Sequence, residues 1–239
     1  MKACAIICML FATCLSSYSA IDPDLIMYLP MDEGAGDTVK DLSPNGFEGK
    51  ITGKEFKWVN GKKGKGLEIV SGTEIQVEDN GMLDNMKALT LEIWVMQDEH
   101  QATGIIQKGV NWPDMSYLIQ PWSDQQIYFG IKDTSSRAIA PAGSYPLGKW
   151  YHIAATFDGT DLKIFIDGEE KSSAKAPVNQ VPNTEAPIQI GNRITGMIDE
   201  FVMYGRALSA QEIKKDMQGV DLSVGYNGKL STTWGYLKH

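Results

Sequence analysis

Cysteine is scarce in this chain of 239 residues, and its placement is more informative than its number. All three cysteines, Cys4, Cys8 and Cys14, lie within residues 1–20. If that segment is removed on secretion, the remaining chain has no thiol and can form no disulfide. We therefore expect a domain that is stabilised by its hydrophobic core and hydrogen bonds, or by a bound metal ion.

Long apolar runs are equally rare. One run, residues 3–15, follows Lys2 and precedes several small residues, which is the arrangement of a secretory signal peptide over residues 1–20. The run is too short for a membrane-spanning helix. A lipoprotein attached through Cys14 and a buried first strand are the alternatives, and Phe11 fits the lipoprotein pattern poorly. The sequence predicts a secreted, periplasmic or cell-surface protein.

Positive charge is also in deficit. Lysine and arginine number 22 against 30 aspartates and glutamates, which gives a formal net charge of −8 without any basic run. Such a surface is a poor partner for nucleic acids and anionic membranes. Neutral glycans, proteins and divalent cations remain as binding partners.

Alternation of apolar and polar residues is what the sequence has in abundance. It is clear in "LTLEIWVM" (89–96) and in residues 149–173, where Asp158-Gly159 and Asp167-Gly168 are typical hairpin turns. Helical periodicity is confined to "AQEIKKDM", which a Ser209/Glu212 capping box opens. We predict an all-β, two-sheet antiparallel sandwich with one short C-terminal helix, a single domain over residues 21–220 and a tail over 221–239.

Several segments resemble a known family in their order along the chain. They include "YLPMDEGAGDTVKDLSPNGFEGKI", "LTLEIWV", "KWYHIAATFDGTDLKIFIDGEE" and "GMIDEFVMYGRALSAQEI". Together they resemble the laminin-G-like, concanavalin A-like jelly-roll domains of bacterial secreted proteins. The resemblance implies a jelly roll that mostly binds glycans or proteins. The wider superfamily also contains glycoside hydrolases and lectins, so the fold alone does not decide the function.

Catalysis needs carboxylates that face the same bond, and strict strand alternation does not supply them. Glu92 shares its predicted face with Trp94 and Met96 rather than with another acid. Asp199 and Glu200 are consecutive, so alternation directs them to opposite faces and makes Glu200 an outward or rim acid. We predict no catalytic residues; a glycoside hydrolase with an atypical site is the alternative.

Asp199 is the candidate metal ligand, because it lies in a strand that is apolar on both faces. A buried carboxylate needs a partner. The resemblance implies a structural Ca²⁺ that joins Asp199 to the N-terminal segment, with Asp32 or Glu33 and the carbonyls around Gly66 as its companions. The alternative is a salt bridge or hydrogen bonds, to an arginine or to the backbone.

Candidate ligand contacts lie in loops. Trp112 and Trp122 stand beside prolines, and an exposed tryptophan there either contacts a ligand or packs on its loop. Tyr145 and Arg193, both near turns, are weaker candidates. The sequence predicts a secreted non-catalytic module that binds carbohydrate or an extracellular protein. A structural scaffold that works only through protein contacts is the further alternative.

Overall fold

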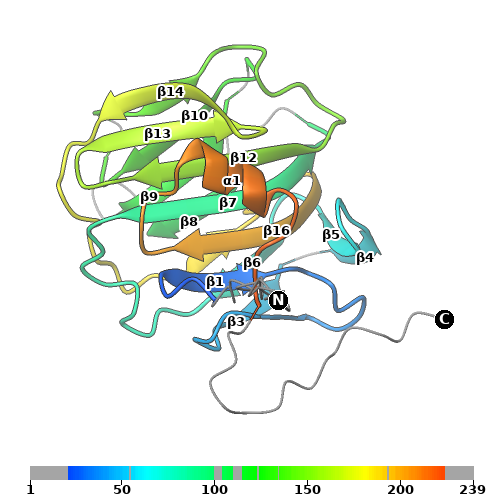
Figure 1. The fold of residues 1–239 in the computed structure, drawn as a ribbon. Helices are drawn as coiled ribbons and strands as arrows, with labels where there is room; N and C mark the ends of the chain where they lie inside the picture. The colour runs from blue at the N-terminus through cyan, green and yellow to red at the C-terminus, as the bar shows by residue number, and fades with distance from the viewer. Residues whose placement is uncertain are drawn as a thin grey trace, which may run out of the picture.

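The protein is described by a computed structural model over residues 21–53, 55–99, 104–109, 115–122, 124–133, 135–192 and 194–223. The predicted signal peptide, most of the predicted tail, Trp112 and Arg193 lie outside these residues. The described part contains sixteen strands and one helix (Figure 1). Their bounds are β1 Leu25–Leu29, β2 Thr38–Lys40, β3 Glu48–Thr52, β4 Phe56–Asn60, β5 Lys65–Ile69, β6 Glu74–Val77, β7 Leu89–Gln97, β8 Ile106–Gly109, β9 Met115–Pro121, β10 Ile127–Ile131, β11 Ala138–Ala140, β12 Tyr151–Phe157, β13 Asp161–Ile166, β14 Glu169–Lys175, β15 Ile188–Ile190, β16 Gly196–Tyr204 and α1 Ala210–Asp216.

The strands form two antiparallel sheets of eight strands each. Sheet A has the order β14-β13-β12-β7-β16-β5-β4, and β1 also pairs with β16. Sheet B has the order β11-β10-β9-β8-β15-β6-β3-β2. The predicted two-sheet sandwich with one short helix is confirmed. No helix in the described ranges is long and apolar enough to cross a membrane.

Local turn chemistry behaves as the sequence predicts. Asp167 and Gly168 both have positive φ, 51° and 72°, as the two central residues of a type I′ hairpin require. At α1, the Glu212 amide donates to Ser209 Oγ and the Ser209 amide donates to Glu212 Oε2, which completes the predicted capping box.

The main core lies between the sheets. On β7 the inward residues Leu91, Ile93 and Val95 are fully buried, and on sheet B Ile75 and Phe129 are buried opposite them. A second, smaller cluster lies on the outer face of sheet A, where helix α1 covers the sheet (Figure 1). Its buried members are Leu25, Tyr28, Ala154, Phe165, Val202, Tyr204, Leu208 and Ile213. Sheet A is therefore covered on both faces around β7 and β16.

A β-bulge in β16 changes the expected orientation of its acids. Asp199 pairs with Trp94 and Val202 pairs with Glu92, so β16 has one more residue than β7 across this interval. Glu200 lies within this interval and has a positive φ of 55°. The expectation that strict alternation separates Asp199 and Glu200 onto opposite faces is therefore wrong: a bulge interrupts the alternation between them.

Candidate functional site

The outer face of sheet B carries a row of glutamines. Gln76 on β6 pairs with Gln189 on β15, and Gln189 pairs with Gln107 on β8. Each lies between residues that face the core or are buried, so the three amides project from the same outer face. All three side chains are half-buried. They are the polar functional groups that sequence analysis missed, although each strand carries the signal of a glutamine directly after a core isoleucine.

Glu74 holds two of these amides in place. Gln76 Nε2 donates to Glu74 Oε1 at 2.6 Å. Gln189 Nε2 donates to both carboxylate oxygens of Glu74, at 2.9 and 3.0 Å. Gln107 Nε2 instead donates to the Gly109 carbonyl at 2.6 Å. The three side chains are thus ordered by hydrogen bonds to groups of their own sheet.

An aromatic pair lies toward the other end of this face. Trp122, in the turn after β9, has 44% of its surface exposed and its ring centroid is 6.1 Å from that of Tyr128. The Arg137 guanidinium lies over the Tyr128 ring at 4.9 Å. The Tyr128 hydroxyl donates to Gln120 Oε1 at 2.6 Å, and burial raises the pKa of Tyr128. The tyrosine therefore remains a neutral hydrogen-bond donor.

The outer face of sheet A differs because its polar groups are covered. Glu92 is fully buried and lies 3.2 Å from Nε2 of His152, which is 2% exposed. Burial raises the pKa of Glu92 to about 8 and lowers the pKa of His152 to about 4. Burial thus favours the protonated carboxyl of Glu92 and the neutral imidazole of His152, and the Trp94 ring lies against His152.

Glu200 belongs to the same covered region and is not the outward or rim acid that alternation predicts. Only 5% of its surface is exposed. Its Oε2 accepts hydrogen bonds from the Tyr28 hydroxyl at 2.9 Å and from Lys63 Nζ at 3.2 Å. Lys63 Nζ also donates to the Asp216 carbonyl at 3.4 Å. One lysine therefore joins the β4–β5 turn, the bulge of β16 and the end of α1.

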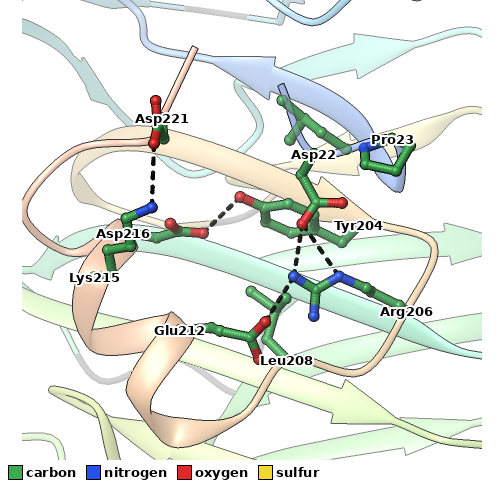
Figure 2. A pocket seen from close by; sticks show the side chains of 10 residues that line it. Asp22, Pro23, Tyr204, Arg206, Leu208, Glu212, Lys215, Asp216 and Asp221 are labelled. Atoms are coloured by element: carbon green, nitrogen blue, oxygen red, sulfur yellow. Dashed lines mark hydrogen bonds and ion pairs between the residues drawn. The ribbon is translucent and has the colours of Figure 1, made fainter. Parts of the chain in front are cut away.

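A cavity of about 310 Å³ opens between the first described residues, the end of β16 and α1. Figure 2 shows that its charged side chains point toward one another. Arg206 pairs with Asp22 at 2.6 Å and with Glu212 at 2.8 Å, and the Tyr204 hydroxyl donates to Asp216 at 2.6 Å. These contacts tie the two ends of the domain together. The lining residues are Asp22, Pro23, Leu25, Tyr204, Arg206, Leu208, Glu212, Lys215, Asp216 and Asp221.

The candidate metal ligands surround the turn between β4 and β5. Asp199 Oδ2 accepts from the Lys63 amide at 2.9 Å, and Asp32 Oδ1 accepts from the Lys65 amide at 2.7 Å. Gly66 lies beside Asp199, because a Cβ on this glycine would be 3.5 Å from the Asp199 Cγ. In the described part of the chain, Glu33 does not bond to the β4–β5 turn; its Oε1 accepts from the Lys40 amide instead.

Asp199 retains one feature of a ligand. Its Oδ1 is buried and has no hydrogen-bond partner among the described residues, and burial raises the pKa of this carboxyl to about 8. Across the described ranges, however, no three acidic, histidine or cysteine side chains are grouped so that they could hold a metal. A Ca²⁺ ion would therefore need backbone carbonyl oxygens beside Asp199.

The candidate ligand contacts have different placements. Trp122 is exposed on the outer face of sheet B. Tyr145 is only 1% exposed, packs in the main core and has its ring 5.3 Å from that of Tyr151. Trp112 and Arg193 are outside the described residues. Of the two candidates that the structure describes, Trp122 is the one that lies next to other groups able to contact a ligand.

Comparison with known proteins agrees with this architecture. Mouse and human pappalysin-1 are each 24% identical over 157 residues, which cover 55% of this chain but only 10% of pappalysin-1. The chain thus spans about a tenth of the length of the curated relatives it matches.

Two solved structures illustrate the shared fold. Domain 4 of AbnA, a GH43 extracellular arabinanase from Geobacillus stearothermophilus in complex with arabinotriose, has a TM-score of 0.64 and 20% identity, over 80% of this chain and 97% of that domain. The binding domain of botulinum neurotoxin DC in complex with rat synaptotagmin II has a TM-score of 0.65 and 15% identity, over 83% of this chain and 52% of the other.

The family itself follows from a match to the chain's sequence. The laminin G-type model described as the concanavalin A-like lectin/glucanases superfamily matches residues 71–214, which is more than half of the chain. The matched region includes β7, β12, β16 and the beginning of α1, the elements that build the sandwich and close its sheet A. This chain belongs to the concanavalin A-like lectin/glucanases superfamily.

Proposed function

We propose that this protein is a secreted, non-catalytic module that binds carbohydrate through the outer face of sheet B. The observation that carries the proposal is the exposed Trp122 ring, which lies beside Tyr128 on the face that also bears the ordered glutamines. Carbohydrate sites combine an aromatic surface with a few fixed polar groups, and both components are present here.

The relatives support this direction. Domain 4 of the arabinanase was solved with arabinotriose, and this chain covers nearly all of that domain. The neurotoxin binding domain was solved with a protein partner, synaptotagmin II. Binding of an extracellular protein is therefore the second candidate. The exposed Ile139, whose strand neighbour is Tyr128, favours it because it adds apolar surface beside Tyr128.

A hydrolytic function is less well supported by the acids of sheet A. Because of the bulge, strand alternation no longer excludes that Asp199 and Glu200 act together. However, Glu92, Asp199 and Glu200 are each no more than 5% exposed. A glycoside hydrolase needs two carboxylates that reach the scissile bond. Glu200 instead contacts Tyr28 and Lys63 below the end of α1. Release of new reducing ends from a bound oligosaccharide would contradict the non-catalytic assignment.

A glycan array tests the binding function. Wild type should bind a defined set of glycans, and Trp122→Ala should weaken that binding at least about tenfold, because stacking on an aromatic ring is lost. Trp112→Ala tests the other tryptophan predicted from the sequence in the same way. Leu42→Ala is the matched control, since Leu42 is 46% exposed and its amide bonds to Tyr28 of sheet A. Unchanged binding by Trp122→Ala would remove this residue from the site.

A structural Ca²⁺ at Asp199 is part of the proposal. The buried Asp199 Oδ1 would supply one ligand, with Asp32 and the carbonyls near Gly66 as its candidate companions. Thermal unfolding should then shift to a higher temperature on addition of Ca²⁺ to protein treated with EDTA. Asp199→Asn should abolish this shift. Identical melting temperatures with EDTA and with Ca²⁺ would contradict the metal site and would mean that Asp199 is stabilised by its hydrogen bond to the β4–β5 turn alone.

A further inference from the structure

We infer that the glutamine row of the sheet B site selects neutral, hydroxyl-rich glycan chains that extend across the strands, and that it discriminates against acidic sugars at these positions. This inference rests on the proposed carbohydrate-binding function and specifies its ligand class. It follows from the direction in which the three glutamine amides are held. Glu74, Gln76, Gln107 and Gln189 are the residues that carry it.

The carboxylate of Glu74 fixes which end of each amide is available. A carboxylate only accepts hydrogen bonds, so Gln76 and Gln189 must turn their NH₂ groups toward Glu74, as observed. Their carbonyl oxygens accept no hydrogen bond from the described residues. Both glutamines therefore present Oε1 as a free acceptor on the outer face.

Gln107 extends the same arrangement by one strand. The Gly109 carbonyl is also only an acceptor, so the Gln107 NH₂ group donates one of its two N–H bonds there, and its Oε1 is left as an acceptor. A Cβ on Gly104 would be 3.1 Å from this oxygen, so the absence of a side chain at Gly104 leaves room beside it. Near Trp122 and Tyr128 the amide is held the other way round. Gln120 Oε1 accepts from the Tyr128 hydroxyl, which leaves the Gln120 NH₂ group as a donor.

The three acceptors define the chemistry of the ligand. A sugar hydroxyl donates one hydrogen bond and accepts others, so it can bond to Oε1 of each glutamine. A carboxylate or sulfate group only accepts, so it cannot bond to these three Oε1 atoms, and the charge of Glu74 also repels it. The row therefore favours neutral sugars over uronic acids and sulfated sugars.

The spacing of the row defines the shape of the ligand. The strands β6, β15 and β8 are adjacent in sheet B. Neighbouring strands are about 4.8 Å apart, so the outer two glutamines are about 10 Å apart. A ligand that contacts all three must run across the strands, and β9 and β10 continue this direction toward Tyr128 and Trp122. This length requires an oligosaccharide rather than a single sugar.

Calorimetric titration with the neutral oligosaccharide that binds best on the array tests the row. Gln107→Ala and Gln189→Ala should each weaken binding about 2- to 10-fold, the effect of losing one neutral hydrogen bond. Gln211→Ala on the exposed side of α1 is the matched control and should bind as wild type does. Equal affinity of wild type and both row variants would overturn the inference while leaving carbohydrate binding intact.

Glu74→Gln tests the positioning role, because a neutral amide keeps the size of Glu74 but no longer forces both neighbours to face it with NH₂. The ratio of affinities for the neutral oligosaccharide and a uronic acid-containing counterpart should exceed about tenfold in wild type and fall in the variant. A change in stability alone would not alter this ratio, and thermal melting verifies folding. A wild type that prefers acidic glycans would overturn the inference, and a wild type that binds no glycan would overturn the proposed function with it.

Discussion

The outer faces of the two sheets both carry polar side chains, but only one face is covered. On the covered face of sheet A, Glu92, His152 and Glu200 have little access to solvent, and Glu200 bonds to Tyr28 and Lys63. On sheet B, Gln76 and Gln107 are half-buried and keep free acceptor atoms. The buried charged residues of sheet A therefore stabilise the fold, although they are the obvious catalytic candidates in the sequence. The uncharged amides of sheet B form the better candidate ligand site.

The largest loss of stability should come from Lys63→Ala on the covered face of sheet A. Removing its ammonium group leaves Glu200 buried with only Tyr28 as a partner, and also frees the end of α1. We expect a loss of about 2 to 3 kcal/mol in the free energy of unfolding. Urea denaturation measures it, with Lys171→Ala as the control because the Lys171–Glu169 pair is exposed. A loss no greater than in the control would show that the covered face does not depend on Lys63.

The pH dependence of stability should reveal the covered acids. Folding raises the pKa values of Glu92 and Asp199 to about 8, so the stability they contribute is complete below their unfolded pKa values and is lost as pH rises through about 8. His152, whose folded pKa is lowered to about 4, opposes this trend only below its ordinary value of 6.5. Stability should therefore fall between pH 6.5 and 8, by about 2 kcal/mol for Glu92 alone.

Glu92→Gln is the matched variant for this pH effect. It keeps the shape of the side chain but cannot titrate. The slope of the unfolding free energy against pH between 6.5 and 8 should therefore decrease by the contribution of one proton. Chemical denaturation at several pH values provides the measurement. Parallel curves for wild type and variant would mean that Glu92 ionises normally in the folded protein.

A smaller effect should follow from Ser209→Ala, which removes the hydroxyl that caps α1. The Glu212 amide then loses its acceptor, and the unfolding free energy should fall by about 1 kcal/mol. Hydrogen exchange of α1 amides should accelerate more than that of β10 amides, because only sheet A is covered by the helix. Uniform acceleration in both sheets would contradict this local role of α1.

The smallest effect on stability should come from Trp122→Ala on the open face. Trp122 is 44% exposed, so its removal should change the unfolding free energy by no more than about 0.5 kcal/mol, although it weakens glycan binding. Thermal melting and glycan titration on the same samples separate the two properties. A large loss of stability would indicate that Trp122 packs its loop rather than contacts a ligand.

The fold was predictable because its signals are local. Alternation in β7, the Asp167-Gly168 turn and the Ser209 cap each require only a few consecutive residues. The orientation of Asp199 and Glu200 was not predictable in this way: no glycine marks the bulge, and Lys63, the lysine that pairs with Glu200, is 137 residues away in sequence.

The candidate site was only partly predictable for a related reason. Trp122 can be recognised in the sequence because it is an aromatic residue beside Pro121 in a loop. The glutamine row cannot be assembled from sequence, because β6, β8 and β15 become neighbours only when distant segments pair. Each strand supplies one unremarkable glutamine, and the acceptor row exists only in the folded sheet.

The most direct test is an NMR titration of the folded protein with the neutral oligosaccharide, following side-chain amide and indole signals. We expect the side-chain signals of Gln76, Gln107, Gln189 and Trp122 to shift with one common dissociation constant, while the backbone amide signal of His152 remains unchanged. Shifts confined to His152 and α1, with the sheet B glutamines unaffected, would contradict it.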